Sequence, residues 1–120
     1  VGDGGFQMTL QELGTMKQNK IPLKILLLNN DFLGMVRQWQ DLFMDKRYSF
    51  TSIEGPDFVK LAQAYDIEAA RVSERKNLKS ALEKMLSHEG GYLLEVKVGK
   101  ENNVFPMVPQ GASVSEIRLS

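Results

Sequence analysis

The feature that most constrains the fold is a run, Leu23–Leu28, that is apolar except for Lys24 and is followed directly by the polar residues Asn29-Asn30-Asp31. A run of this length with apolar residues in consecutive positions predicts a strand that is covered on both faces, as in a parallel sheet. Asn and Asp disfavour strands and favour turns, so the strand should end where they begin. In open α/β sheets ligands bind beyond such strand ends, and this turn is therefore a candidate site.

Helical patterns flank the run on both sides. Apolar residues recur at three- and four-residue spacing from Phe6 to Met16, which predicts a helix with one apolar face. Thr9 and Glu12 have the spacing of a capping box, which would place the start of the regular helix at Thr9. Pro22 cannot continue a helix interior and should end it.

Beyond the turn, the apolar residues of the segment 32–44 again have helical spacing. Gly34 lowers the stability of this helix but would let a ligand approach the backbone. The positive N-terminal end of the helix would point at the same crevice as the strand end. Residues 45–56 show no periodicity and are predicted to form a loop.

The second half of the chain repeats the alternation of helix and strand. It predicts a helix capped by Asp57, a short strand over 67–72, a helix that ends near Gly90-Gly91, a strand over 92–98 and an irregular tail. This alternation predicts an α/β fold, a three-layer α/β/α arrangement with a mainly parallel sheet. At 120 residues the chain has the length of a single domain.

Composition narrows the function. Fifteen basic and fifteen acidic residues cancel, so no global field attracts nucleic acid or an anionic membrane surface. The absence of cysteine excludes disulfides and thiolate metal sites and permits a reducing, cytoplasmic setting. The longest apolar run is far shorter than the roughly 20 residues that span a bilayer. We therefore expect no nucleic-acid partner and no membrane partner.

The candidate site combines Gly2-Asp3-Gly4-Gly5 with Asn29-Asn30. A β-loop-α-β unit would bring Asp3 and Asn30 to neighbouring strand ends, where a carboxylate and an amide oxygen suit Mg²⁺. Backbone N–H groups of the glycines would face a phosphate at a helix start. Either motif alone is more often an ordinary turn, but the pair with a helical pattern between them predicts a magnesium–diphosphate site.

Other residues have sequence patterns that give weaker support for a functional role. Met35 and Trp39 lie four residues apart and are either core residues of their helix or the wall of an apolar pocket. The only histidine, His88, stands at a helix end without a serine or cysteine partner pattern and is predicted to be a solvated surface residue. The Asp45-Lys46-Arg47 cluster is predicted to be a solvated loop.

The paired motifs match the thiamine-diphosphate motif, which begins with GDG and closes with NN. The segments GDGGFQMTLQEL, LKILLLNNDFLGMVRQWQDLFMDKRYS, PDFVKLAQAYDI, YLLEVKV and NVFPMVPQGAS resemble the C-terminal end of the acetolactate synthase (acetohydroxyacid synthase) large catalytic subunits. The resemblance covers essentially the whole chain. MVRQWQ and FPMVPQGAS point to this family in preference to related decarboxylases or oxidases.

The resemblance implies roles for individual residues. Gly5 departs from it, because many members carry Ser there, which removes a hydroxyl but keeps the backbone donor. The implied metal ligands are Asp3, Asn30 and the main-chain carbonyl of Phe32, the implied cofactor-binding residues are Gly2, Asp3, Gly4, Gly5, Asn30, Gly34 and Met35, and the implied substrate-channel residues are Met35 and Trp39.

The resemblance also implies an activity and its partners. The family condenses two pyruvates, or pyruvate and 2-ketobutyrate, with loss of CO₂, in valine, leucine and isoleucine biosynthesis. Its cofactors are thiamine diphosphate and Mg²⁺, with FAD in the full-length protein. Its members form homodimers or homotetramers, some with a small regulatory subunit.

Because Val1 runs straight into the glycine turn, we expect a fragment of a longer polypeptide. Residues 1–120 would be the C-terminal part of the thiamine-diphosphate domain. The N-terminal pyrimidine-binding domain, with the activating glutamate, and the FAD-binding middle domain would lie outside it. No catalytic residue is therefore predicted in this chain, which should be inactive alone.

Two alternatives stay open. One is another thiamine-diphosphate enzyme, such as a carboligase, a pyruvate oxidase or a 2-keto acid decarboxylase. The other is a non-catalytic module that binds a nucleotide or serves only in assembly.

Overall fold

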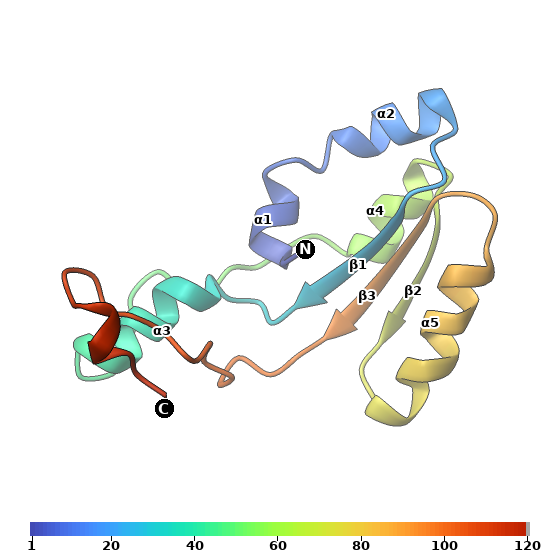
Figure 1. Ribbon diagram of the computed structural model, residues 1–120. Helices are drawn as coiled ribbons and strands as arrows, with labels where there is room; N and C mark the ends of the chain where they lie inside the picture. The colour runs from blue at the N-terminus through green and yellow to red at the C-terminus, as the bar shows by residue number, and fades with distance from the viewer. Residues whose placement is uncertain (120) are drawn as a thin grey trace.

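A three-stranded parallel sheet forms the centre of the computed structural model, which describes residues 1–119. The strands are β1 (Lys24–Asn29), β2 (Glu68–Val72) and β3 (Tyr92–Lys97), in the order β1-β3-β2 (Figure 1). The central strand β3 pairs in parallel with both neighbours. The carboxyl ends of all three strands therefore meet at one edge of the sheet, and the predicted parallel sheet is confirmed.

Helices cover both faces of the sheet. The α-helices are α1 (Asp3–Gln7), α2 (Glu12–Asn19), α3 (Gly34–Phe43), α4 (Phe58–Ala64) and α5 (Leu78–Ser87), and two 3₁₀ turns span Arg75–Asn77 and Val114–Glu116. One buried cluster joins α1, α2 and α4 to Leu27 and Leu93 of the sheet. A second cluster joins α5 to Tyr92 and Leu94 on the opposite face. The predicted three-layer α/β/α arrangement is confirmed.

The single helix predicted from Phe6 to Met16 is wrong, because the segment forms two helices, α1 and α2. Between them the backbone makes a series of i→i−3 bonds, such as Thr9 N–H to Phe6 O (3.1 Å) and Glu12 N–H to Thr9 O (3.0 Å). The capping box does not form, and the Glu12 carboxylate instead accepts from the Thr15 hydroxyl. The apolar spacing survives because both helices pack on one core.

The prediction that β1 is covered on both faces is also wrong within this chain. Leu27 is fully buried, but Leu26 and Leu28 on the other face are 37% and 44% exposed. The reason is the strand order, which puts β1 at an edge, whereas α5 packs over β2 and β3. An apolar pattern indicates that both faces of a strand are buried, but it does not indicate which element packs on each face.

The remaining element predictions are confirmed to within a few residues. Asp57 caps α4 by accepting from the N–H groups of Val59 and Lys60. The segment 45–56 contains no helix or strand, and the tail is irregular apart from its 3₁₀ turn. Figure 1 shows that the tail runs along α3, beyond the end of the sheet, and the radius of gyration of 17.0 Å exceeds the about 14 Å of a compact domain of this length.

Candidate functional site

A pocket of about 530 Å³ opens at the carboxyl ends of the strands, between α1, the turn after β1 and the start of α3. The chain start is fixed to β1 there, because Gly2 bridges Leu28 in parallel and Leu28 N–H donates to Val1 O (2.8 Å). The pocket is lined by every residue predicted to contact cofactor or metal, namely Gly2, Asp3, Gly4, Gly5, Asn30, Phe32, Gly34 and Met35.

Asp3 is the first residue of α1 and is only 3% exposed. Within residues 1–119 its carboxylate takes part in no hydrogen bond or ion pair, yet it lines the pocket. Within residues 1–119 the fully enclosed side-chain oxygen without a partner is Tyr92 Oη, so the Asp3 oxygens are reached from the pocket, where they can bind a cation. The position therefore has the chemistry of a metal ligand.

The turn after β1 is held by its own side chains. Asn29 Oδ1 accepts from Asp31 N–H (3.0 Å), and Asn30 Oδ1 accepts from Phe32 N–H (3.1 Å). Asp31 adopts a left-handed backbone with φ of 59°, a conformation that Asp tolerates in turns. The amide oxygen of Asn30 has a second lone pair, so this hydrogen bond leaves it able to bind a cation.

The next residues pair with a distant loop. Leu33 N–H donates to Thr51 O (2.8 Å) and Ile53 N–H donates to Asp31 O (2.9 Å). The Phe32 carbonyl itself accepts no hydrogen bond from any residue in the described range 1–119. Because Phe32 lines the pocket, its main-chain oxygen is available to a ligand there.

Two glycines allow close packing at the site. A Cβ at Gly4 would lie 3.1 Å from side-chain carbons of Leu33 and Ile53, and a Cβ at Gly34 would lie 3.3 Å from Nδ2 of Asn30. A Cβ at Gly5 would meet only Val1, at 3.9 Å. A side chain at position 4 or 34 would therefore displace residues that line the pocket, whereas position 5 has room for a side chain.

Of the two predicted channel residues, Met35 lines the pocket and Trp39 does not. Met35 is 53% exposed and lines the pocket. Trp39, one turn further along α3, is outside the lining and packs on Phe43 with ring centroids 4.8 Å apart. The substrate-channel role of both residues stays a prediction.

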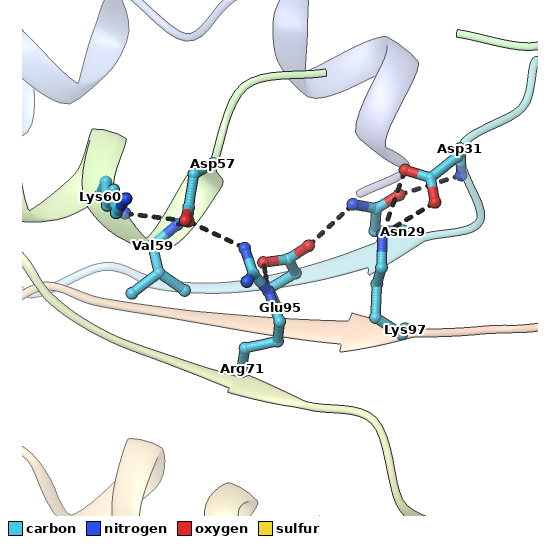
Figure 2. Close-up of polar contacts among 8 residues, drawn as sticks. All are labelled: Asn29, Asp31, Asp57, Val59, Lys60, Arg71, Glu95 and Lys97. Carbon is cyan, nitrogen blue, oxygen red and sulfur yellow. Dashed lines mark hydrogen bonds and ion pairs between the residues drawn. The ribbon is translucent and has the colours of Figure 1, made fainter. Parts of the chain in front are cut away.

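A polar network lies beside the site, on the α4 side of the sheet, and it runs from the buried Asn29 and Glu95 to the partly exposed Arg71 and Asp57 (Figure 2). Glu95 of β3 accepts from Asn29 Nδ2 (2.8 Å) and from Arg71 Nε (2.6 Å), and Arg71 also donates to Asp57 (2.8 Å). The hydrogen bond that Arg71 donates to the Glu95 carboxylate raises the pKa of Arg71. Backbone donation from Lys60 is the main cause that lowers the pKa of Asp57.

Sequence reasoning missed several residues here. Val98, Gly99 and Asn102 line the pocket, and Glu95 and Arg71 support the turn from the sheet. A signal existed for some of them, since Val98 follows a parallel strand end and Glu95 is a charge inside an apolar strand. Asn102 lies in the irregular tail, where no periodicity marks it.

The less informative candidates behave as predicted. His88 is exposed, with its ring against Tyr92, and residues 45–47 lie in an exposed loop. In the described residues, no group of three or more His, Cys, Asp or Glu could hold a metal ion. None of the helices described is both long enough and apolar enough to cross a membrane.

Comparison with known proteins adds to this geometry. Residues 1–96 match the family described as thiamine pyrophosphate enzyme, C-terminal TPP binding domain. The chain is 50% identical to the acetolactate synthase isozyme 2 large subunit of Escherichia coli (strain K12), over 97% of its own length and 21% of that protein. It is 46% identical to the mitochondrial acetolactate synthase catalytic subunit of Saccharomyces cerevisiae, over 96% of its length and 17% of that protein.

Among solved structures, the chain is similar to a thiamine diphosphate-dependent 4-hydroxybenzoylformate decarboxylase of Rhodococcus jostii RHA1. The TM-score is 0.75 at 27% identity, over 82% of this chain and 19% of that one. This likeness agrees with the α/β/α sheet described above. The chain thus spans about a fifth of the length of the relatives that it matches.

Proposed function

Because the chain belongs to the family of C-terminal, thiamine pyrophosphate-binding domains of thiamine pyrophosphate enzymes, we propose that it forms the diphosphate-binding part of an acetolactate synthase large subunit. Thiamine pyrophosphate is thiamine diphosphate by its older name. The observation that carries the proposal is that Asp3, a residue only 3% exposed, lines the same pocket as Asn30, while its carboxylate has no hydrogen-bond or ion-pair partner within residues 1–119.

The metal would be Mg²⁺, held by the Asp3 carboxylate, the Asn30 amide oxygen and the Phe32 carbonyl. Mg²⁺ commonly takes one or two protein carboxylates and completes its shell with phosphate oxygens and water. A site with one acidic residue fits that habit, and the described residues contain no acidic cage that would bind the ion without a phosphate. The ion would therefore bind together with the diphosphate.

The diphosphate would lie against the start of α1, with Gly2, Gly4 and Gly5 offering backbone N–H groups. In support, Gly4 lines the pocket, and a Cβ there would crowd the side-chain ends of Leu33 and Ile53 at 3.1 Å. Gly34 and Met35 would line the cofactor from the α3 side. These residues bind and orient the diphosphate and contribute no proton transfer.

When bound, thiamine diphosphate supplies a carbon nucleophile and an electron sink for 2-keto acids. The contribution of this chain is to fix the position of that cofactor and to neutralise its diphosphate charge. Met35 and Trp39 would border the channel by which pyruvate or 2-ketobutyrate enters. The proposed overall reaction is condensation of two 2-keto acids with loss of CO₂, a step of branched-chain amino acid biosynthesis.

The rest of the proposed enzyme lies outside residues 1–120, which would make up one C-terminal domain part. We assign the activating glutamate to an N-terminal pyrimidine-binding domain and FAD to a middle domain. The whole protein would be a homodimer or homotetramer. The names large subunit and catalytic subunit among the relatives support a further, regulatory subunit. A cytoplasmic location is part of the same proposal, and the absence of cysteine permits it.

A second candidate activity is decarboxylation of a 2-keto acid, favoured by the structural likeness to a decarboxylase. That likeness is at 27% identity, whereas the acetolactate synthases reach 50%. Acetolactate as the product from pyruvate supports the first proposal. Release of a free aldehyde as the main product would favour the second.

The test uses the full-length protein, with calorimetry of thiamine diphosphate binding at increasing Mg²⁺ and a product assay with pyruvate. We expect Asp3→Asn to lose Mg²⁺-dependent cofactor binding and acetolactate formation. Asp66→Asn is the matched control, because that aspartate is exposed and pairs with Lys17, away from the pocket. Unchanged Mg²⁺-dependent binding by Asp3→Asn would refute the proposed metal site.

A further inference from the structure

A carboxylate is buried in the middle of the sheet, at Glu95 of the central strand β3. The residue is 1% exposed, and in the ladders its partners are Leu27 on β1 and Arg71 on β2. Carboxylates are almost never this deeply buried unless they are paired. The residue is not among those that line the pocket, so its burial needs another explanation.

The two oxygens of Glu95 accept from different strands. Oε2 accepts from Nε of Arg71 on β2 at 2.6 Å, and Oε1 accepts from Nδ2 of Asn29 on β1 at 2.8 Å (Figure 2). Arg71 is itself held by Asp57, at 2.8 Å, before the start of α4. The carboxylate is thus fixed from one side by a cation and offers its other oxygen only to Asn29.

Asn29 is the link between this carboxylate and the pocket. The residue is 4% exposed, and both ends of its amide are used, because Nδ2 donates to Glu95 and Oδ1 accepts from Asp31 N–H at 3.0 Å. An amide has chemically different ends, so the acceptor at Glu95 decides which end faces the turn. That turn contains Asn30, the proposed amide ligand of the metal.

We propose that Glu95 is a positioning residue for the magnesium site, acting through the side chain of Asn29 on the turn that presents Asn30 and Phe32. The inference rests on the proposed function, since it concerns the same metal site. Glu95 itself touches neither metal nor cofactor. It supplies the fixed acceptor that keeps the turn in its binding geometry before the ion arrives.

A carboxylate and an amide at position 95 should have different effects on the hydrogen bonds of Arg71 and Asn29. Glu95→Gln has the same shape but carries one donor and one acceptor. If the new amide oxygen at position 95 faces Arg71, the new NH₂ meets the NH₂ of Asn29. If the Asn29 amide then rotates to offer its oxygen, the Asn29 NH₂ meets the N–H of Asp31. In a third arrangement the new oxygen faces Asn29 and the new NH₂ meets Nε of Arg71, which breaks the ion pair that fixes this side chain. Two donors therefore face each other in every arrangement, at the turn in two of them and at Arg71 in the third.

The conflict can be removed by exchanging the two groups. In the double variant Glu95→Gln/Asn29→Asp, the new carboxylate at position 29 accepts both from the amide at position 95 and from Asp31 N–H. The net charge of the pair is unchanged. Asn29→Asp alone places two carboxylates in contact. Each single substitution should therefore damage the site, and the double substitution should repair it.

The experiment measures, in the full-length protein, the Mg²⁺ concentration at which thiamine diphosphate binding is half-maximal by calorimetry. We expect each single variant to raise this concentration by about 10- to 100-fold, the range for residues that orient metal ligands. The double variant should return to within about threefold of the wild type, a residual difference of about 0.7 kcal/mol, since a tenfold change in affinity corresponds to about 1.4 kcal/mol. This readout needs no catalytic turnover.

Val96→Ala is the matched control for loss of stability. Val96 is the next residue on β3 and is buried in the cluster around α5, on the opposite face from Asn29. The control should lower the melting temperature and leave the Mg²⁺ concentration unchanged. A Glu95→Gln variant with the Mg²⁺ dependence of Val96→Ala would overturn the proposal, as would a double variant whose defect is the sum of the singles.

Two further arms keep the outcome interpretable. If Glu95→Gln does not fold, Asn29→Ala tests the same link from the other end, because it leaves the ion pair between Glu95 and Arg71 intact. Wild-type Mg²⁺ dependence in Asn29→Ala overturns the positioning role. If Asp3→Asn keeps normal Mg²⁺ dependence, the metal site itself is misassigned. Loss in Asp3→Asn with no change in the Glu95 variants overturns the positioning role alone.

Discussion

At the scale of single residues, the candidate site is characterised by oxygen atoms that still have a lone pair free to bind a ligand. The Asp3 carboxylate and the Phe32 carbonyl accept no hydrogen bond within residues 1–119, and the Asn30 oxygen keeps a free lone pair. Gly34 lies against Asn30, since a Cβ at this position would be 3.3 Å from Nδ2. The absence of a side chain at 34 is therefore part of how the amide is oriented.

We predict opposite effects of Gly34→Ala on stability and on metal binding. Alanine should stabilise the start of α3 by about 0.4–1 kcal/mol, because it restricts the unfolded chain. The new methyl group should displace the Asn30 amide and raise the Mg²⁺ needed for half-maximal cofactor binding several-fold. Melting temperature and calorimetry of the full-length protein measure the two effects.

Gly14→Ala is the control for that experiment, because Gly14 lies in α2, outside the pocket lining, and its methyl group would make an ordinary contact with Tyr65 at 3.6 Å. Alanine should stabilise this helix in the same way. We expect normal Mg²⁺ dependence from this variant. An unaltered Mg²⁺ requirement in Gly34→Ala would show that Asn30 accommodates the methyl group without consequence.

At the scale of elements, α3 is attached to two irregular segments by two glutamines of similar geometry. Gln38 is 1% exposed and exchanges hydrogen bonds with the N–H (2.8 Å) and the carbonyl (3.0 Å) of Val104 in the tail. Gln40 exchanges the same pair of bonds with Ser49, both at 3.0 Å. A side-chain amide thus replaces a strand partner for each segment.

We predict that Gln38→Leu releases the tail at Val104. The substitution keeps the size of the side chain but removes the partner of the Val104 N–H and of the Val104 carbonyl, a loss of about 0.5–1.5 kcal/mol for each hydrogen bond because the 60% exposed Val104 can then bind water. Hydrogen exchange of peptides that cover 100–107 should become at least tenfold faster in the full-length protein.

Gln40→Leu serves as the reciprocal control, since it should accelerate exchange at 45–52 and leave the tail protected. Equal exchange at Val104 in wild type and Gln38→Leu would mean that other contacts hold the tail. Those contacts include the Arg37 guanidinium, which donates to the Lys100 carbonyl and pairs with Glu101.

At the scale of the whole molecule, the chain is elongated and one strand has an exposed apolar face. Its extents of 46 × 28 × 25 Å are those of an elongated body, and α3 with the tail extends beyond the sheet (Figure 1). Leu26 and Leu28 expose an apolar face on the edge strand β1. Large apolar side chains gathered in this way commonly mark a surface that another element covers.

We predict that residues 1–120 alone produce no acetolactate from pyruvate, even with saturating thiamine diphosphate and Mg²⁺. The reason is that the proposal assigns the binding of Mg²⁺ and diphosphate to these residues, and the activation of the cofactor to a glutamate in another domain. A colorimetric acetolactate assay, with the full-length protein at equal molarity as the positive control, measures this. Turnover above a blank without protein would contradict it.

Local sequence patterns predicted the layers, the parallel sheet and the two motifs whose residues line the pocket. Periodicity and turn residues depend on local chemistry, so the strand that ends at Asn29 and the cap at Asp57 were predictable. Strand order, the open face of β1 and the break between α1 and α2 were decided by tertiary packing. They depend on which element covers which face, and a local pattern carries no such information.

The same division applies within the site. Asp3 and Asn30 could be paired from sequence because two motifs and the pattern between them place both at strand ends. Glu95 could not be linked to Asn29, because the two lie 66 positions apart and meet only through the register of β1 on β3. Residue types determined which groups could bind a metal. The sheet decided which buried carboxylate holds them in place.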